Sequence, residues 1–174
     1  MSEERGLVQV FFGDGKGKTS AALGVLLRAS GHGKRVLFLA FFKGRFSGEI
    51  AAVQCIPGVE YYQFGTEEFV CGGRLSPEKV QEFQCGWHLA QEALLTGAYD
   101  LIILDEFLYA FSWGLLSWET FRAVLFSRKP WVEVVLTGRE APEELLATAD
   151  LISEIRNIRH PIEQGIRARR GFEY

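Results

Sequence analysis

The stretch GDGKGKT, which begins at Gly13, alternates three glycines with two lysines between an apolar run and an alanine-rich one. We expect Gly13, Gly15 and Gly17 to adopt positive φ and to turn amide N–H groups inward at a helix N-terminus, an arrangement that binds anions. In GxxxxGK[ST] loops the lysine reaches phosphate oxygens and the hydroxyl ligates Mg²⁺, roles that Lys18 and Thr19 would take here. A merely flexible turn is the alternative, but the surrounding strand and helix patterns favour nucleotide phosphate binding.

The loop is one residue shorter than that general pattern, because the position five before Gly17 is Phe12 and the first glycine comes at Gly13. In kinase and GTPase loops the longer segment helps to wrap the β-phosphate so that the γ-phosphorus faces the nucleophile. We therefore expect a shorter loop with two lysines, Lys16 and Lys18, to hold a triphosphate differently.

Two carboxylates follow the apolar run LIIL, as Asp105 and Glu106. At the carboxyl end of a buried strand, either one could hold Mg²⁺ directly or through water beside a nucleotide. The residues leave open which of the two is the direct ligand. They also leave open that a parallel strand simply ends in polar residues, or that the glutamate is the general base of an ATPase.

The elements that must position these groups alternate along the chain. Strands are predicted over 7–12, 35–42, 59–64, 99–104, 132–136 and 150–155, and helices over 19–30, 77–95, 117–126 and 142–147. Strands separated by helices predict an α/β fold with a doubly wound, mostly parallel sheet and helices on both faces, whose ligands bind at the carboxyl ends of the strands. The length favours one domain over 1–174.

Composition excludes several classes of protein. The chain has 174 residues, 48% of them hydrophobic, and a net charge of -3, which argues against a nucleic-acid-coating protein. Its three cysteines have no CxxC or Cys/His ligand spacing, and no segment has the apolar length of a membrane span or a signal peptide. We therefore expect a cytoplasmic protein with no membrane or nucleic-acid partner.

The motifs carry a resemblance that covers nearly the whole chain. In order and spacing, the segments GDGKGKTSAALG, GHGKRV, FFKG, PGVEYYQFG, LDEFLYA, VVLTGREAPEELLATADLISEIR and RHPIEQGIRARRGFEY resemble the P-loop type of corrinoid adenosyltransferase of cobalamin biosynthesis and salvage. The resemblance implies a RecA-like P-loop fold, usually a homodimer, which transfers the 5'-deoxyadenosyl group of MgATP to a Co(I) corrinoid and releases triphosphate. It also implies that ATP lies reversed in the short loop, with ribose C5' facing the attacking cobalt, and that a reductase or flavin reductant supplies Co(I).

The resemblance assigns site residues by position. Catalytic roles fall to Lys18 and Glu106, and the metal candidates are Thr19, Asp105 and Glu106. The ATP-binding candidates are Gly13, Asp14, Gly15, Lys16, Gly17, Lys18, Thr19 and Ser20. Arg28 of the first predicted helix is a further candidate, with a role on the helix surface as the alternative.

For the corrinoid, similarity points to Phe69 and Cys71, although relatives often carry Phe-Thr-Trp where this chain has Phe-Val-Cys. Arg139, which follows a predicted strand, is a further corrinoid candidate that could instead meet phosphate. Trp113 or Phe111 could substitute for the missing tryptophan. Lys43 could also meet phosphate or corrinoid. The basic tail, with Arg167, Arg169 and Arg170, could lie near the triphosphate or be a solvated end.

Two other functions use the same residues. A compact RecA-like ATPase or phosphotransferase would direct Glu106 at the γ-phosphate and release ADP. A carrier of ATP and corrinoid would bind both and turn over neither.

Overall fold

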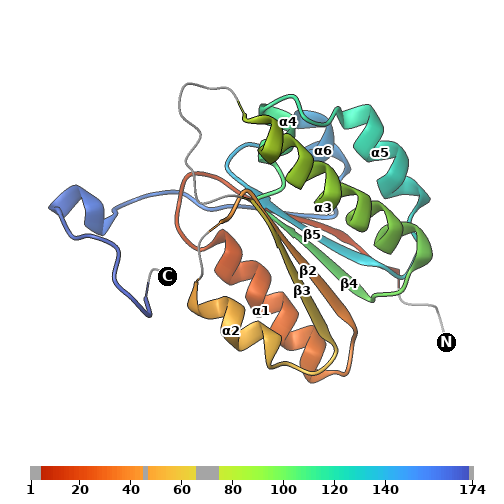
Figure 1. Ribbon diagram of the computed structural model, residues 1–174, viewed down its shortest axis with the longest axis horizontal. Helices are drawn as coiled ribbons and strands as arrows, with labels where there is room; N and C mark the ends of the chain where they lie inside the picture. Colours follow the sequence, from red (N-terminus) through yellow and green to blue (C-terminus); the bar gives the residue numbers. More distant parts are fainter. Residues whose placement is uncertain (1–4, 45–46, 66–74, 173–174) are drawn as a thin grey trace.

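A single sheet of six parallel strands forms the centre of the protein (Figure 1). The computed structural model describes residues 5–44, 47–65 and 75–172. The strands run in the order β3-β2-β4-β5-β1-β6. Their bounds are β1 Val8–Phe12, β2 Val36–Phe41, β3 Val59–Phe64, β4 Leu101–Asp105, β5 Glu133–Gly138 and β6 Leu151–Glu154. The predicted parallel α/β fold is confirmed, and it is consistent with a RecA-like P-loop domain.

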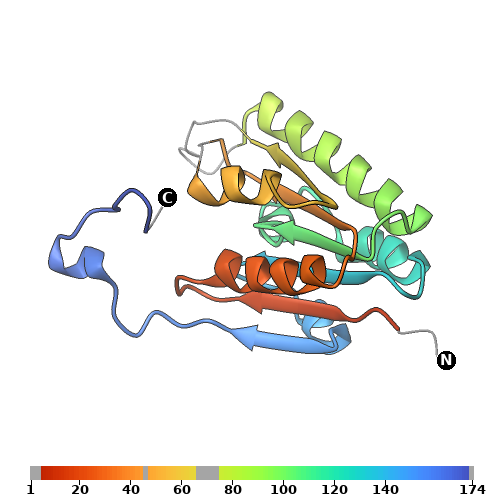
Figure 2. The same ribbon diagram turned by 90° about the horizontal axis from the view of Figure 1, so that it is seen from below.

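Helices cover both faces of the sheet, as Figures 1 and 2 show. On one face lie α1 (Lys18–Gly31) and α2 (Gly48–Gln54). The other face is covered by α3 (Pro77–Thr96), α4 (Tyr109–Ser112), α5 (Trp118–Ser127) and α6 (Glu143–Thr148). The short helices α2 and α4 were not predicted, because a helix of one or two turns leaves little periodicity in the sequence.

The core is split by the sheet because its central strands are apolar on both sides. In β4, Ile102 and Leu104 pack with α3 and α5, whereas Leu101 and Ile103 pack with α1 and α2. All five residues of this strand are buried. Burial on both faces is typical of a parallel strand between two helical layers, and it fixes β4 rigidly in the middle of the fold.

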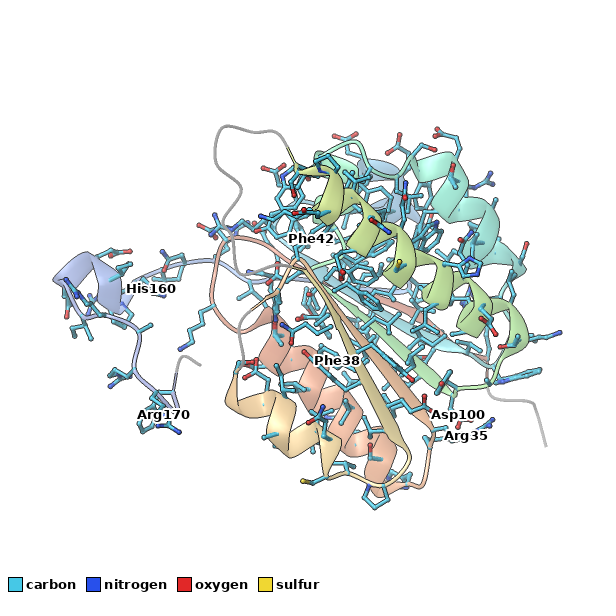
Figure 3. The ribbon with its side chains drawn as sticks, in the orientation of Figure 1. Arg35, Phe38, Phe42, Asp100, His160 and Arg170 are labelled. Carbon is cyan, nitrogen blue, oxygen red and sulfur yellow. The ribbon has the colours of Figure 1, made fainter. Side chains whose placement is uncertain are left out.

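Strand register brings the polar strand ends together at one edge. Ala40 of β2 pairs with Asp105 of β4, and Leu104 of β4 pairs with Leu136 of β5, so Asp105 lies beside the residue that follows, Thr137. Strand β5 continues two residues beyond its predicted end at Leu136, which places Thr137 in the sheet. Figure 3 shows Phe42 at this edge, with Arg35 and Asp100 at the opposite end of the strands.

The chain leaves β6 as an extended segment with one 3-10 turn, η1 (Pro161–Gln164), and then returns toward the N-terminus of α1 (Figures 1 and 2). His160 and Arg170 lie on this segment, away from the sheet (Figure 3).

None of the described helices is long and apolar enough to cross a membrane.

Candidate active site

The glycine loop joins β1 to α1 at the carboxyl edge of the sheet. Gly13 and Gly17 have φ of 116° and 124°, as expected, but Gly15 does not lie in the left-handed region. Gly15 is needed for another reason: a Cβ there would come within 2.7 Å of the Arg156 carbonyl carbon. The expectation of positive φ at all three glycines is therefore wrong at Gly15, where close packing against the chain after β6 excludes a side chain.

Two of the loop amides are used to hold the loop in place. Gly13 N donates to the Arg139 carbonyl at 3.0 Å, and Gly15 N donates to the Ile155 carbonyl at 2.8 Å. The loop is thereby tied to the ends of β5 and β6. The amides suited to an anion are those of the first turn of α1, since the first N–H groups of a helix have no intrahelical acceptor.

Lys18 is the first residue of α1 and is buried at the base of the loop. Its Nζ donates to the Gly15 carbonyl at 2.7 Å. Burial lowers the pKa of Lys18, and the nearby Arg139 lowers it further, while Glu106 opposes both effects. The hydrogen bond to Gly15 thus places the Lys18 ammonium group against the glycine loop.

Asp105 is the centre of a hydrogen-bonded cluster and is fully buried. Thr19 Oγ1 donates to Asp105 Oδ1 at 2.9 Å, and Thr137 Oγ1 donates to the same oxygen at 2.7 Å. Lys43 Nζ forms an ion pair with Asp105 Oδ2 at 2.5 Å. Burial alone would lower the pKa of Lys43, but the charge and hydrogen bond of Asp105, with the charges of Glu106 and Glu49, outweigh it and raise the pKa.

Glu106 follows Asp105 with φ of 59°, an uncommon conformation for a residue other than glycine. Its amide donates to Thr137 Oγ1 at 2.8 Å, which holds this turn against β5. Burial raises the pKa of Glu106, and the charge of Asp105 raises it further, whereas Lys43, Lys18 and Arg139 lower it.

A pocket lies over the start of α1. It is lined by Gly15, Lys16, Gly17, Lys18, Thr19, Ser20, Leu23, Lys43, Gly48, Glu49, Glu106, Gly171 and Phe172. The returning C-terminal segment closes one side, where Lys16 Nζ donates to the Phe172 carbonyl at 3.2 Å. Gly171 and Phe172 line the pocket, whereas Arg167, Arg169 and Arg170 do not, so whether the basic run meets the triphosphate stays a prediction.

The remaining predicted residues are dispersed. Asp14 is exposed and accepts from Asn157 N at 3.1 Å, and so binds the segment after β6. Arg139 follows β5 at the site edge; burial raises the pKa of the nearby Tyr109, and the charge of Arg139 lowers it in part. Arg28 lies in the last turn of α1, ten residues beyond Lys18, which is about 15 Å along a helix axis. The structure therefore does not bring Arg28 to the loop, and its ATP-binding role stays a prediction.

The corrinoid candidates Phe69 and Cys71 lie outside the described residues. Of their two suggested substitutes, Phe111 packs edge-on against Phe107 and Phe121 in the core. Trp113 is partly exposed, stacks on Tyr109 at 4.8 Å between ring centroids and meets Phe42 edge-on at 4.7 Å. Trp113 is therefore one aromatic side chain near this edge that a ligand could reach.

The roles of two residues of the cluster were not predicted from the sequence. Thr137 carries no motif of its own, and its position beside Asp105 depends on the pairing of β4 with β5. Lys43 was considered as a phosphate or corrinoid contact, but its ion pair with Asp105 was not foreseen. The sequence did contain one indication of both roles: Lys43 directly follows the predicted strand 35–42, and Thr137 directly follows the predicted strand 132–136.

The arrangement suits a polyphosphate and a divalent cation. Lysines 16, 18 and 43 line one pocket with Glu49 and Glu106, and the lining residue Thr19 bonds the carboxylate of Asp105, which is buried behind the lining. Across 5–44, 47–65 and 75–172, no three His, Cys, Asp or Glu side chains converge as a metal-binding group. A cation here would complete its coordination with water or with oxygens from a nucleotide, as Mg²⁺ usually does.

Comparisons with known proteins agree with this chemistry. A sequence model of the family described as ATP:corrinoid adenosyltransferase BtuR/CobO/CobP matches residues 4–174. The chain is 33% identical over 172 residues to the corrinoid adenosyltransferase of Escherichia coli (strain K12), covering 99% of this chain and 87% of that protein. The corrinoid adenosyltransferase CobA of Salmonella typhimurium matches to the same extent. The corrinoid adenosyltransferase of Pseudomonas aeruginosa is 32% identical over 173 residues, 99% of this chain and 85% of its own length.

Proposed function

The chain belongs to the ATP:corrinoid adenosyltransferase family, and from that premise we propose how its residues carry out adenosyl transfer. It is a corrinoid adenosyltransferase, which uses ATP and a corrinoid as substrates. The observation that carries the residue-level account is the bond between Thr19 of the loop helix and the buried Asp105 at the base of the pocket. It joins the phosphate loop to the acidic strand end.

Mg²⁺ is the cation that this pair would hold. Thr19 and Asp105 present hard oxygen ligands, and the ammonium group of Lys43 bonds both of them, which supports a cation at this position. When bound, Mg²⁺ would neutralise charge on the triphosphate. Asp105 rather than Glu106 is the direct ligand in this account, because only Asp105 is bonded to Thr19 in the described contacts.

The reaction needs little help from protein nucleophiles. Co(I) is a strong nucleophile: its electron pair forms the Co–C bond at C5' of ATP while the C5'–O bond breaks and its electron pair leaves with triphosphate. The protein must therefore position ATP and stabilise the leaving anion. Lys16, Lys18 and the first-turn amides of α1 would do so, and the charge of Glu106 helps to keep the buried Lys18 protonated.

The corrinoid would approach from the aromatic side of the same edge. Trp113 and Tyr109 present stacked rings there, and Arg139, which directly follows β5, adds a cation for amide or phosphate groups of the corrinoid. Contacts from Phe69 and Cys71 remain part of the proposal through the resemblance alone.

The wider setting is also proposed. We infer that each chain forms one domain over 1–174 and that two chains form a cytoplasmic homodimer. A reductase or flavin reductant would supply the corrinoid in its Co(I) state. Exposed apolar side chains on the extended C-terminal segment support self-association, since Ile158 is 88% exposed and Ile162 68%. Sedimentation equilibrium tests the homodimer, which a monomer at micromolar concentration would contradict.

An anaerobic assay with MgATP and chemically reduced cob(I)alamin tests the proposed reaction. We expect adenosylcobalamin, seen in the visible spectrum, together with triphosphate on anion-exchange chromatography. ADP and phosphate without a corrinoid change would support an ATPase, for which the raised pKa of Glu106 would suit a general base. Binding of both substrates without turnover would support a carrier.

A further inference from the structure

Lys43 follows β2 and directs its ammonium at the two side chains that we assign to Mg²⁺. Its Nζ lies 2.5 Å from Asp105 Oδ2 and 3.3 Å from Thr19 Oγ1. Asp105 is fully buried, and a buried carboxylate is stable only beside a cation or several donors. Lys43 supplies that cation from the place where a metal would bond the same two residues.

The backbone of Lys43 is held from several sides. Phe42, just before it, has φ of 56°, and within the described part of the chain only Glu106 shares such a conformation among residues other than glycine. Gln63 Nε2 donates to the Lys43 carbonyl at 2.7 Å, and a Cβ on Gly65 would come within 2.7 Å of Lys43 N. Strained conformations persist where their surroundings fix them, so these contacts favour a change in the lysine side chain over a change in its backbone.

Mg²⁺ and an ammonium repel one another strongly when both approach one carboxylate. Metal binding at Asp105 and Thr19 would therefore displace the Lys43 side chain. Lys43 lines the same pocket as Lys16 and Lys18, and a flexible four-carbon side chain can turn within that pocket while its backbone stays fixed. The triphosphate of ATP is the anion that this pocket would offer it.

Resting on the proposed function, we propose that Lys43 is a further triphosphate-binding residue of adenosyl transfer, held on Asp105 in the nucleotide-free protein and moved to the phosphate chain when Mg²⁺ takes Asp105 and Thr19. As the C5'–O bond breaks, its electron pair leaves with the triphosphate. The Lys43 ammonium keeps its proton and donates a hydrogen bond to the anion. In this way Mg²⁺ replaces the Lys43 ammonium, and the buried Asp105 carboxylate always has a cation beside it.

Mn²⁺ binding to the nucleotide-free protein, followed by EPR, tests the first half of the proposal. Lys43→Met removes the competing charge and is expected to bind Mn²⁺ about tenfold more tightly than wild type. Lys43→Arg keeps the charge and is expected to bind Mn²⁺ as wild type does. An unchanged Mn²⁺ affinity in Lys43→Met would overturn the exchange of cations.

Calorimetric binding of triphosphate tests the second half, at a Mg²⁺ concentration that saturates both proteins so that the tighter metal binding of Lys43→Met does not contribute. Lys43→Met is expected to bind about ten- to hundredfold more weakly, the size of a lost hydrogen bond to a charged group. Lys34→Met is the matched control, because Lys34 lies at the opposite end of the strands beside Asp100. Equal affinity in Lys43→Met and wild type would refute the phosphate contact. Neither measurement uses a corrinoid, so either can fail while adenosyl transfer itself stands.

The wild-type protein provides a test that does not depend on the folding of a variant. In a crystal structure with Mg²⁺ and triphosphate, we expect Lys43 Nζ within hydrogen-bonding distance of a phosphate oxygen. Lys43 still paired with Asp105 in that complex would contradict the proposal.

Discussion

The hydroxyl of Thr137 bonds both residues at the acidic end of β4, Asp105 and Glu106. It donates to Asp105 Oδ1 and accepts from Glu106 N, and it is fully buried. A side chain that orients a metal ligand contributes to metal affinity without touching the metal. Thr137 therefore positions Asp105 for Thr19 and fixes the turn that presents Glu106.

Thr137→Val keeps the shape of the side chain and removes this hydroxyl. We expect the variant to lose about 1–3 kcal/mol of unfolding free energy, because a buried carboxylate oxygen and an amide each lose a partner. Mg²⁺ affinity in the presence of ATP should fall about 10–100-fold, as for other residues that orient metal ligands. Urea unfolding and calorimetric titration measure the two effects.

Thr137→Ser is the matched control, since it retains the hydroxyl. It should preserve most of the Mg²⁺ affinity. Wild-type affinity in Thr137→Val would show that Asp105 needs no support from β5.

At the scale of elements, the phosphate loop depends on the chain that follows β6. Gly15 packs against Arg156, and its amide donates to Ile155, so the loop and this segment form one packed unit. The sequence predicted the loop, its glycines and the helix after it. It could not predict the role of Gly15, because contacts between segments so distant in the chain follow from the position of β6 beside β1.

Gly15→Ala is expected to destabilise the protein by roughly 1–3 kcal/mol, since the new methyl group overlaps backbone atoms. If ATP binding must restore the displaced loop, the same strain lowers ATP affinity by about ten- to a hundredfold. Gly24→Ala serves as the control, because nothing lies within 4 Å of the added Cβ in α1. That control should gain about 0.5–1 kcal/mol from its helix propensity. Equal ATP affinity in the two variants would contradict a packed loop.

Trp113 follows α4, a helix that the sequence did not predict, and its partly exposed ring is our candidate for the corrinoid face. Trp113→Ala should raise the KM for corrinoid roughly tenfold, the scale of a lost aromatic contact with its buried area, and leave ATP affinity unchanged. Trp131→Ala is the control, since Trp131 is similarly exposed but lies before β5, at the opposite edge. Steady-state kinetics measure both variants, and an unchanged KM for corrinoid in Trp113→Ala would show that the corrinoid does not bind at this face.

At the scale of the whole molecule, the C-terminal segment returns to the N-terminal loop. Gly171 and Phe172 line the pocket, and the Phe172 carbonyl accepts from Lys16. The class of fold followed from alternating apolar strands and helices, because burial on both faces is visible in a sequence. The strand order and the path of this segment did not, because each depends on packing between distant segments.

Deletion of residues 171–174 tests that path. The shortened chain should bind triphosphate about two- to tenfold more weakly, as expected for the loss of an exposed hydrogen bond and its neighbouring surface. Calorimetry measures the change, with deletion of 173–174 alone as the control. No difference between the two deletions would show that the returning segment does not contribute to the site.

The central claim is that C5' of ATP, and not the γ-phosphorus, is the atom attacked at this site. The most direct measurement is a single turnover, without oxygen, of ATP carrying ¹³C at C5' with chemically reduced cob(I)alamin, analysed by ¹³C NMR and by chromatography of the phosphates. The account predicts that the label appears in a Co–CH₂ group with one equivalent of intact triphosphate. Label that remains in ADP, with free phosphate as the second product, would contradict it.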